Sequence, residues 1–444
     1  MLKFFKSLYL TQRLFLILLG FVLAFILANF IEPLFILVKY LFLLYFLAII
    51  ADMFLLYLVK NGIRANRLLP EKFSNGDDNP VHITFENLYN FHVSLSVIDE
   101  IPIQFQIRNF LFKVKLKKGE CKEYTYQIHP TKRGVYKFGK LNVYAESILG
   151  LVKKRYIFEE GKDIAVYPSF LQLQKYDLLA FTNRLHEYGV KKIRKVGNTM
   201  EFEQIRDYVY GDDIRNINWK ATAKRNQLMI NQFQDERSQP VYSVIDKGRV
   251  MLMPFNGLSL LDYSINASLV ISNVALQKND KAGLFTFSRK IENKIIAERR
   301  KSQMELILNT LYNIRTDFAE SDFGRLYGNI KRTINQRSLI LLFTNFENMD
   351  SMQRQLPYLK AIAKNHLLIV IFFKNVELKK LINQPVKNTR EIYQKVIAEK
   401  FAFDKELIVK ELKKNGIQSI LTEPEKLTIN TINKYLELKA RGTI

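Results

Sequence analysis

Two long apolar runs fill most of the first sixty residues, and they constrain the fold more than any other feature. Residues 14–31 contain no charged side chain. At about 1.5 Å per residue, a helix of this length approaches the ~30 Å hydrocarbon core of a bilayer. Glu32 and Pro33 interrupt the apolar sequence, and residues 37–59 then carry only Lys39 and Asp52 as charges. Residues 1–63 therefore predict a two-helix transmembrane hairpin, rather than a cleaved signal peptide or a pair of buried helices.

The charges around these runs predict the orientation of the hairpin. The short turn between the runs carries Glu32, with Lys39 as the nearest basic residue. Because basic residues favour the cytoplasmic side of a membrane, both ends of the hairpin should lie in the cytoplasm, together with the rest of the chain. The basic residues that flank the hairpin are Lys3, Lys6 and Arg13 before the first run, and Lys60, Arg64, Arg67 and Lys72 after the second.

The next region, residues 71–168, has the pattern of an all-β domain. Apolar and polar residues alternate in short segments, and turn residues separate these segments about every ten positions. This pattern is typical of an antiparallel, immunoglobulin-like sandwich. The expected strands are residues 81–88, 92–101, 105–110, 112–119, 122–129 and 133–147.

The C-terminal region, residues 240–444, alternates buried strands with helices. Such alternation predicts a doubly wound α/β domain with a parallel sheet, and ligands at the carboxyl ends of its strands. The expected strands are residues 240–246, 281–288, 338–346, 366–373 and 416–424. The expected helices are residues 260–279, 302–314, 323–335, 356–365 and 426–442.

A connector, residues 169–239, joins the two domains and contains the most distinctive motif of the chain. Residues 201–236 read EFEQIRDYVYGDDIRNINWKATAKRNQLMINQFQDE. This segment resembles the hallmark of the bacterial domain-of-unknown-function family 58, and PTKRGVYKFGKLNV with ESILGLVKK resembles the upstream β-segment of that family. The matching hallmark positions are Glu201, Phe202, Arg206, Tyr208, Gly211, Asp212, Asp213, Arg215, Ile217, Trp219, Ala221, Ala223, Lys224 and Leu228.

The resemblance implies a fold and a type of function. In this family the hallmark leads into a domain similar to the von Willebrand factor type A fold. Family members often accompany MoxR-type AAA+ ATPases and are thought to be membrane-bound adaptors. The resemblance implies an ATPase of this type as a partner, and together with the predicted hairpin it leads us to expect a multi-pass protein of the bacterial inner membrane that also contacts membrane lipids.

The hallmark segment itself has two interpretations that do not exclude each other. It can be a salt-bridged clip between the domains, with Trp219 anchored on the α/β domain, or a docking surface for a partner ATPase. Acid–base catalysis by Asp212 and Asp213 is a third interpretation, which the absence of a nucleophile or oxyanion motif disfavours. The candidate partner-binding residues are Arg206, Asp212, Asp213, Arg215, Trp219, Lys220, Lys224 and Arg225.

Type A domains often bind a divalent cation, and the sequence keeps only remnants of that site. The resemblance implies ligands at an Asp-x-Ser-x-Ser motif, a loop hydroxyl and a later Asp, all hard oxygen donors suited to Mg²⁺. Here Asp246 is followed by Lys247, and the next two ligand positions, 248 and 250, are glycine and valine. The remaining candidates are Ser321 or Thr316, and Asn345. We therefore expect no metal and no cofactor, and expect Asp246 to cap a turn or to pair with Lys247.

The formal charge of +24 at pH 7 raises the question of an acidic partner. The basic residues are spread over all regions, and no RNA-binding signature accompanies them, so we predict no nucleic-acid binding. P-loop and dinucleotide-binding motifs are missing from the sequence. We therefore predict a non-catalytic, membrane-anchored adaptor, with a divalent-cation-dependent, adhesion-type ligand-binding module as the alternative. The sequence indicates neither the client nor the oligomeric state.

Overall fold

The computed structural model describes residues 2–108, 110–158, 161–172, 201–210, 212–234, 238–316, 318–385 and 388–443. The chain divides into two compact units, Met1–Tyr167 and Pro168–Ile444. The first unit contains the apolar helices and a β domain. The second unit contains the hallmark segment and an α/β domain.

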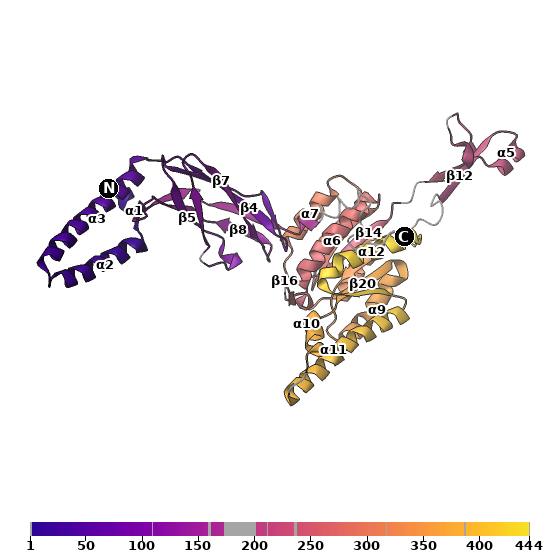
Figure 1. Cartoon of the computed structure of the whole chain (residues 1–444). Helices are drawn as coiled ribbons and strands as arrows, with labels where there is room; N and C mark the ends of the chain where they lie inside the picture. Colours follow the sequence, from indigo (N-terminus) through magenta and orange to yellow (C-terminus); the bar gives the residue numbers. More distant parts are fainter. Residues whose placement is uncertain are drawn as a thin grey trace. The chain divides into compact units, whose positions relative to one another are not determined.

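The apolar runs form two helices, α2 (Gln12–Ala28) and α3 (Glu32–Leu58), which follow a short helix α1 (Leu2–Ser7) (Figure 1). Helix α3 begins at Glu32 and not near residue 37, because Pro33 sits in its first turn, where a missing N–H group costs nothing. The two helices meet through aromatic pairs, including Phe21–Phe42 with ring centroids 5.5 Å apart. Among the described residues, α3 alone is long and apolar enough to cross a membrane, and α2 has 17 residues.

The β domain consists of three sheets. Their strand orders are β1-β10-β9-β5-β6, β3-β11-β8 and β2-β4-β7. Alternate residues point into a shared core, as Val81, Ile83 and Phe85 do on β4. The strands are β1 (Leu8–Leu10), β2 (Ile63–Leu68), β3 (Lys72–Ser74), β4 (Asn79–Asn87), β5 (Val93–Asp99), β6 (Leu111–Leu116), β7 (Cys121–Ile128), β8 (Gly134–Phe138), β9 (Leu141–Glu146), β10 (Val152–Phe158) and β11 (Lys162–Tyr167).

Three details of the β domain differ from the sequence-based expectation. The domain begins before residue 71, because β2 pairs with β4 along its whole length. The strand expected at residues 105–110 is absent from the described part of that range, where the chain makes a 3₁₀ turn at Ile103–Phe105 after Pro102. Strand β3 pairs with β11 in parallel, so the domain is not purely antiparallel.

The N-terminal segment and helix α3 are built into the β domain. Strand β1 pairs with β10, and the Thr11 hydroxyl, which caps α2, donates to the carbonyl of Gly150 at 2.8 Å. The buried carboxylate of Asp52 accepts hydrogen bonds from the Ser147 hydroxyl and from the N–H groups of Leu151 and Val152. The last seven residues of α3, from Asp52 to Leu58, are therefore part of this domain.

Lys154 of the β domain caps the C-terminal end of α3. The ammonium of Lys154 donates to the carbonyls of Leu56, at 3.0 Å, and Val59, at 2.8 Å. These carbonyls lack partners within the helix, and a cation there also complements the negative end of the helix dipole. Burial lowers the pKa of Lys154 to about 8.

The α/β domain has a six-stranded sheet with the order β18-β17-β14-β19-β20-β21. The doubly wound class is as expected, but the edge strand β18 is antiparallel to β17, so the sheet is mixed. The strands are β14 (Pro240–Asp246), β17 (Lys281–Phe287), β18 (Ile291–Glu298), β19 (Leu339–Phe343), β20 (Leu367–Phe373) and β21 (Gln418–Thr422).

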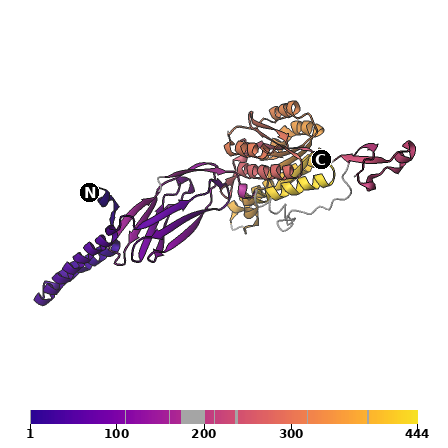
Figure 2. The same cartoon turned by 90° about the horizontal axis from the view of Figure 1, so that it is seen from above.

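Helices cover both faces of this sheet. One buried core joins the sheet to α6 (Leu260–Gln277), α7 (Gln303–Asn313) and α12 (Leu427–Ala440), and α6 and α12 lie side by side (Figures 1 and 2). A second core joins the opposite face to α8 (Phe323–Thr333), α9 (Met349–Asn365) and the end of α11 (Thr389–Lys414). Neighbouring β14 residues divide between the cores, with Val241 and Ile245 in one and Tyr242 and Val244 in the other.

Candidate functional site

The hallmark segment forms a two-stranded hairpin, β12 (Glu201–Asp207) and β13 (Met229–Gln234), with a short helix α5 (Trp219–Arg225) between the strands (Figure 1). Residues 211, 235 and 236 of the segment lie outside the described residues.

An ion pair and two caps hold the loop of this hairpin in place. Arg206 on β12 donates to both carboxylate oxygens of Asp212, at 2.7 and 2.8 Å. Asp212 also accepts from the N–H of Val209, and together these donors hold the pKa of Asp212 below its ordinary value. Asp213 caps a 3₁₀ turn through the N–H of Arg215, and Asn218 caps α5 through the N–H of Ala221.

In this arrangement Asp212 and Asp213 both have local structural roles, one in an ion pair and the other as a cap. A lowered pKa suits Asp212 to an ion pair and not to general acid catalysis near neutral pH. The predicted internal neutralisation is only partial: among the described residues, Arg206 and Asp212 pair, whereas Lys220, Lys224 and Arg225 make no ion pair and are exposed.

Trp219 does not occupy the place expected for it. Its side chain is 67% exposed at the start of α5, so the predicted packing against the α/β domain is wrong for this structure. Tyr210, in the loop of the same hairpin, is 99% exposed. The hairpin therefore presents a tryptophan, a tyrosine and several cations on its surface.

The remnant metal position lies at the carboxyl edge of the sheet, at the end of β14. The Asp246 carboxylate is buried and accepts hydrogen bonds from the Gly248 N–H at 2.9 Å, the Thr344 hydroxyl at 2.7 Å and the Ser321 hydroxyl. A Cβ atom at residue 248 would lie 2.2 Å from the Ser321 oxygen, so glycine allows this closure. Three protein donors thus occupy the oxygens that a cation would need.

The other residues expected near this position have different partners. Of the two alternatives expected for Asp246, the turn cap is the one observed, through the Gly248 N–H, whereas Lys247 pairs with Glu292 at 2.7 Å and not with Asp246. The Thr316 hydroxyl donates to the carbonyl of Lys247, and the Asn345 side chain accepts from Lys405 at 2.7 Å. Within the described ranges, no group of three or more His, Cys, Asp or Glu side chains is placed to hold a metal ion.

Comparison with known proteins matches most of the hallmark segment, and the α/β domain up to residue 381, to one family. Residues 204–381 match the family model described as "Protein of unknown function DUF58". The chain contains a DUF58 region. The family resemblance inferred from the hallmark motif is thereby confirmed.

One curated relative and two solved structures illustrate these similarities. "Uncharacterized protein YeaD" of Bacillus subtilis (strain 168) is 29% identical over 125 residues, and the match covers 28% of this chain and 30% of that relative. The conserved hypothetical protein BatB from Bacteroides thetaiotaomicron is 14% identical, with 46% of this chain and 100% of that chain covered and a TM-score of 0.31. The SpRpn10 VWA domain is 12% identical, with 44% and 93% covered and a TM-score of 0.28. Because both TM-scores are low, these similarities do not support the fold assignment. The α/β fold is assigned from the observed strand order of this chain.

Two functional candidates were missed by sequence reasoning. Thr344 lies one residue after β19, and its position at a strand end was a usable signal. Lys405 lies in α11, a helix that was not expected from the sequence pattern. Its contact with Asn345 is the property that sets it apart, and that contact exists only in the folded chain.

Proposed function

We propose that the protein is a membrane-anchored, non-catalytic scaffold, and that its hallmark hairpin docks an AAA+ ATPase of the MoxR type. The observation that carries the proposal is the surface of α5. There, Trp219 is 67% exposed beside the exposed cations Lys220, Lys224 and Arg225. Tryptophan and arginine are enriched among residues that dominate binding at protein interfaces.

Membrane anchoring is supported by the exposure of α3. Only 11% of its most apolar 18-residue window is buried, which argues against the core helix of a soluble protein. Asp52 and strand β1 tie this region to the β domain, which argues against a signal sequence that is cleaved off. In the proposed arrangement, α2 and α3 both cross the bacterial inner membrane, and the remaining domains lie in the cytoplasm.

The alternative, a divalent-cation-dependent binding module, has less support. The Asp246 carboxylate already accepts hydrogen bonds from Gly248, Ser321 and Thr344. A cation at this position would have to displace the donors while gaining few new oxygen ligands. The proposed scaffold does not depend on a metal.

The docking proposal is tested by charge reversal on α5. Full-length protein is purified from gently solubilised membranes as wild type and as the Lys220→Glu, Lys224→Glu, Arg225→Glu variant. We expect an AAA+ ATPase to co-purify with the wild type and to fall at least tenfold in the variant, as measured by quantitative mass spectrometry.

A matched control separates docking from a general charge effect. Lys113, Lys115 and Lys118 are exposed lysines of the β domain, and their change to glutamate alters the net charge equally. The ATPase should be retained by this control. Recovery of the ATPase with the α5 variant, or its absence from the wild type, would remove the docking proposal.

A further inference from the structure

The α/β domain contains a pocket that neither the hallmark segment nor the remnant metal position accounts for. Its volume is about 590 Å³, within the roughly 300–1,000 Å³ typical of small-molecule sites. It lies at the carboxyl ends of β20 and β21, below the β15–β16 turn (Pro254–Phe255, Leu258–Ser259) and beside α11 and α10 (Val376–Asn383). This is the edge of an open α/β sheet at which ligands bind.

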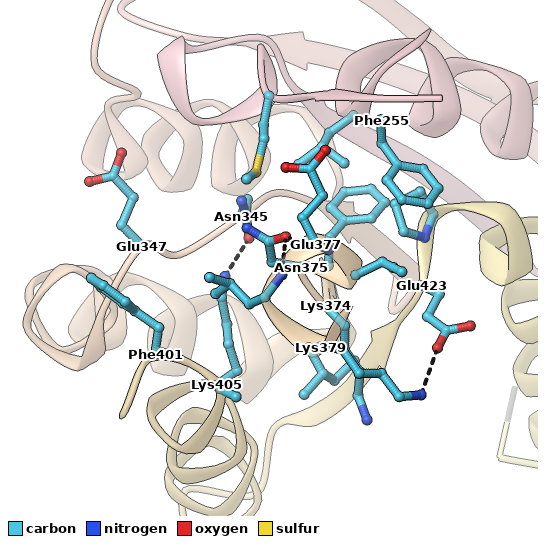
Figure 3. Close-up of a pocket in the computed structure, with 18 of the residues that line it drawn as sticks. Phe255, Asn345, Glu347, Lys374, Asn375, Glu377, Lys379, Phe401, Lys405 and Glu423 are labelled. Carbon is cyan, nitrogen blue, oxygen red and sulfur yellow. Dashed lines mark hydrogen bonds and ion pairs between the residues drawn. The ribbon is translucent and has the colours of Figure 1, made fainter. Parts of the chain in front are cut away.

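The walls of the pocket are largely apolar. The described lining residues include three phenylalanine rings, and they come from β15, β20, β21, α10 and α11, among other elements (Figure 3). The main apolar lining residues are Phe255, Phe373, Val376, Ile382, Phe401 and Leu421. A ligand that fills this space must therefore have an apolar body, because a polar one would lose its hydration without replacement hydrogen bonds.

One cation, Lys405, is fixed in this apolar setting. Its ammonium donates to the Asn345 side chain at 2.7 Å (Figure 3), and it also donates to the carbonyl of Phe346. An ammonium has three N–H donors, and in the described part of the chain no third acceptor lies within hydrogen-bonding distance of it. Burial lowers the pKa of Lys405 to about 8, so the group is still mostly charged at neutral pH.

The other charges of the pocket limit the charge of a ligand. Lys379 pairs with Glu423 at 3.5 Å, and the Glu347 carboxylate, although it points away from Lys405, still acts on that lysine by raising its pKa (Figure 3). Among the described lining residues, Glu377 and Glu406 add further negative charge, and Lys374 adds one positive charge. A phosphate or another polyanion would be repelled, whereas a single negative charge placed at Lys405 is accommodated.

We propose that this pocket binds a monocarboxylate with an apolar body. The carboxylate accepts a hydrogen bond from the Lys405 ammonium, and the apolar body lies between Phe255, Phe373 and Phe401. A charge-assisted hydrogen bond in a partly dehydrated site supplies the preference for an acid over a neutral analogue. This binding activity goes beyond the proposed scaffold and does not depend on a partner ATPase.

The test compares an acid with its neutral analogue. Full-length protein in lipid nanodiscs is titrated calorimetrically with 4-phenylbutyrate and with 4-phenylbutan-1-ol, and empty nanodiscs serve as the blank. We expect one saturable site per chain and at least tenfold tighter binding of the acid. Equal affinities, or no saturable binding of the acid, would overturn the proposal.

Substitutions at three positions locate the binding site. Lys405→Met should reduce the affinity for the acid to that for the alcohol, and Lys405→Gln, which keeps a donor for Asn345, should do the same if the methionine variant does not fold. Ala402→Trp, on the pocket wall, should abolish binding of both compounds. Lys360→Met, at an exposed lysine of α9 outside the pocket lining, should keep the preference for the acid. An unchanged preference in both Lys405 variants, or unchanged binding in Ala402→Trp, places the ligand elsewhere and refutes the assignment.

Discussion

At the scale of single residues, Asp52 is the most consequential charge in the N-terminal unit. In the sequence it looks like an interruption of an apolar run, yet its carboxylate is buried and receives three hydrogen bonds from residues 147–152. Glu32 and Asp52 are 20 positions apart, or about 30 Å along a helix, which is the thickness of a bilayer core. Asp52 thus marks the point where the apolar helix enters the β domain.

Removal of this carboxylate should destabilise the β domain. In Asp52→Ala, the Ser147 hydroxyl and the N–H groups of Leu151 and Val152 lose their acceptor in a buried site. Leaving buried neutral donors without their acceptor costs about 1–3 kcal/mol. We expect a decrease of this size in the free energy of unfolding, measured by urea titration of the full chain in detergent.

The control Asp163→Ala, whose side chain is 59% exposed, should stay within about 0.5 kcal/mol of wild type. Equal midpoints for the two variants would contradict this role of Asp52.

At the scale of elements, the hallmark hairpin should depend on the Arg206–Asp212 pair in a pH-dependent way. The pKa of Asp212 is lowered in the folded hairpin, so the pair stabilises the hairpin fully above the ordinary aspartate value of 3.8. This contribution is lost as the pH falls through the lowered folded-state pKa. A carbon-13 NMR titration should give a midpoint below 3.8 for Asp212, and Arg206→Gln should move it upward. Asp207→Asn, a change on the same strand, should leave it in place; a wild-type midpoint at or above 3.8 would refute the pairing.

The elements also illustrate what the sequence can and cannot predict. Strands β14, β19 and β20 were predictable, because each is a short, continuous apolar run buried on both faces of the sheet. The edge strand β18 was missed, since it is only partly buried and lacks such a run. Helix α11 was missed as well, and nothing in its local sequence distinguishes Lys405 from Lys395 or Lys400. The hallmark motif predicted the family, whereas the exposure of Trp219 depends on tertiary structure that a motif does not encode.

At the scale of the whole molecule, the structure changes which flanking basic residues can be counted when the orientation of the helices in a membrane is predicted. Arg67 was counted among the flanking basic residues, but it is buried and pairs with Asp99, so it cannot face a membrane surface. Lys6, Arg13, Lys60 and Arg64 remain exposed at the end of the helices joined to the β domain. The opposite end carries Glu32, with Lys39 two turns further along α3. The imbalance still favours a cytoplasmic position for the β domain.

This orientation can be measured with the single native cysteine. Cys121 is free and exposed on β7 of the β domain, whereas Phe30, in the turn between α2 and α3, is 82% exposed. If both helices cross the membrane, these two positions lie on opposite sides. A membrane-impermeant maleimide should label Cys121 in inverted inner-membrane vesicles and not in intact spheroplasts. The Cys121→Ser, Phe30→Cys variant should show the reverse. Labelling of both positions from the same side would exclude a hairpin that spans the bilayer twice, and labelling of Cys121 in spheroplasts would exclude the cytoplasmic orientation.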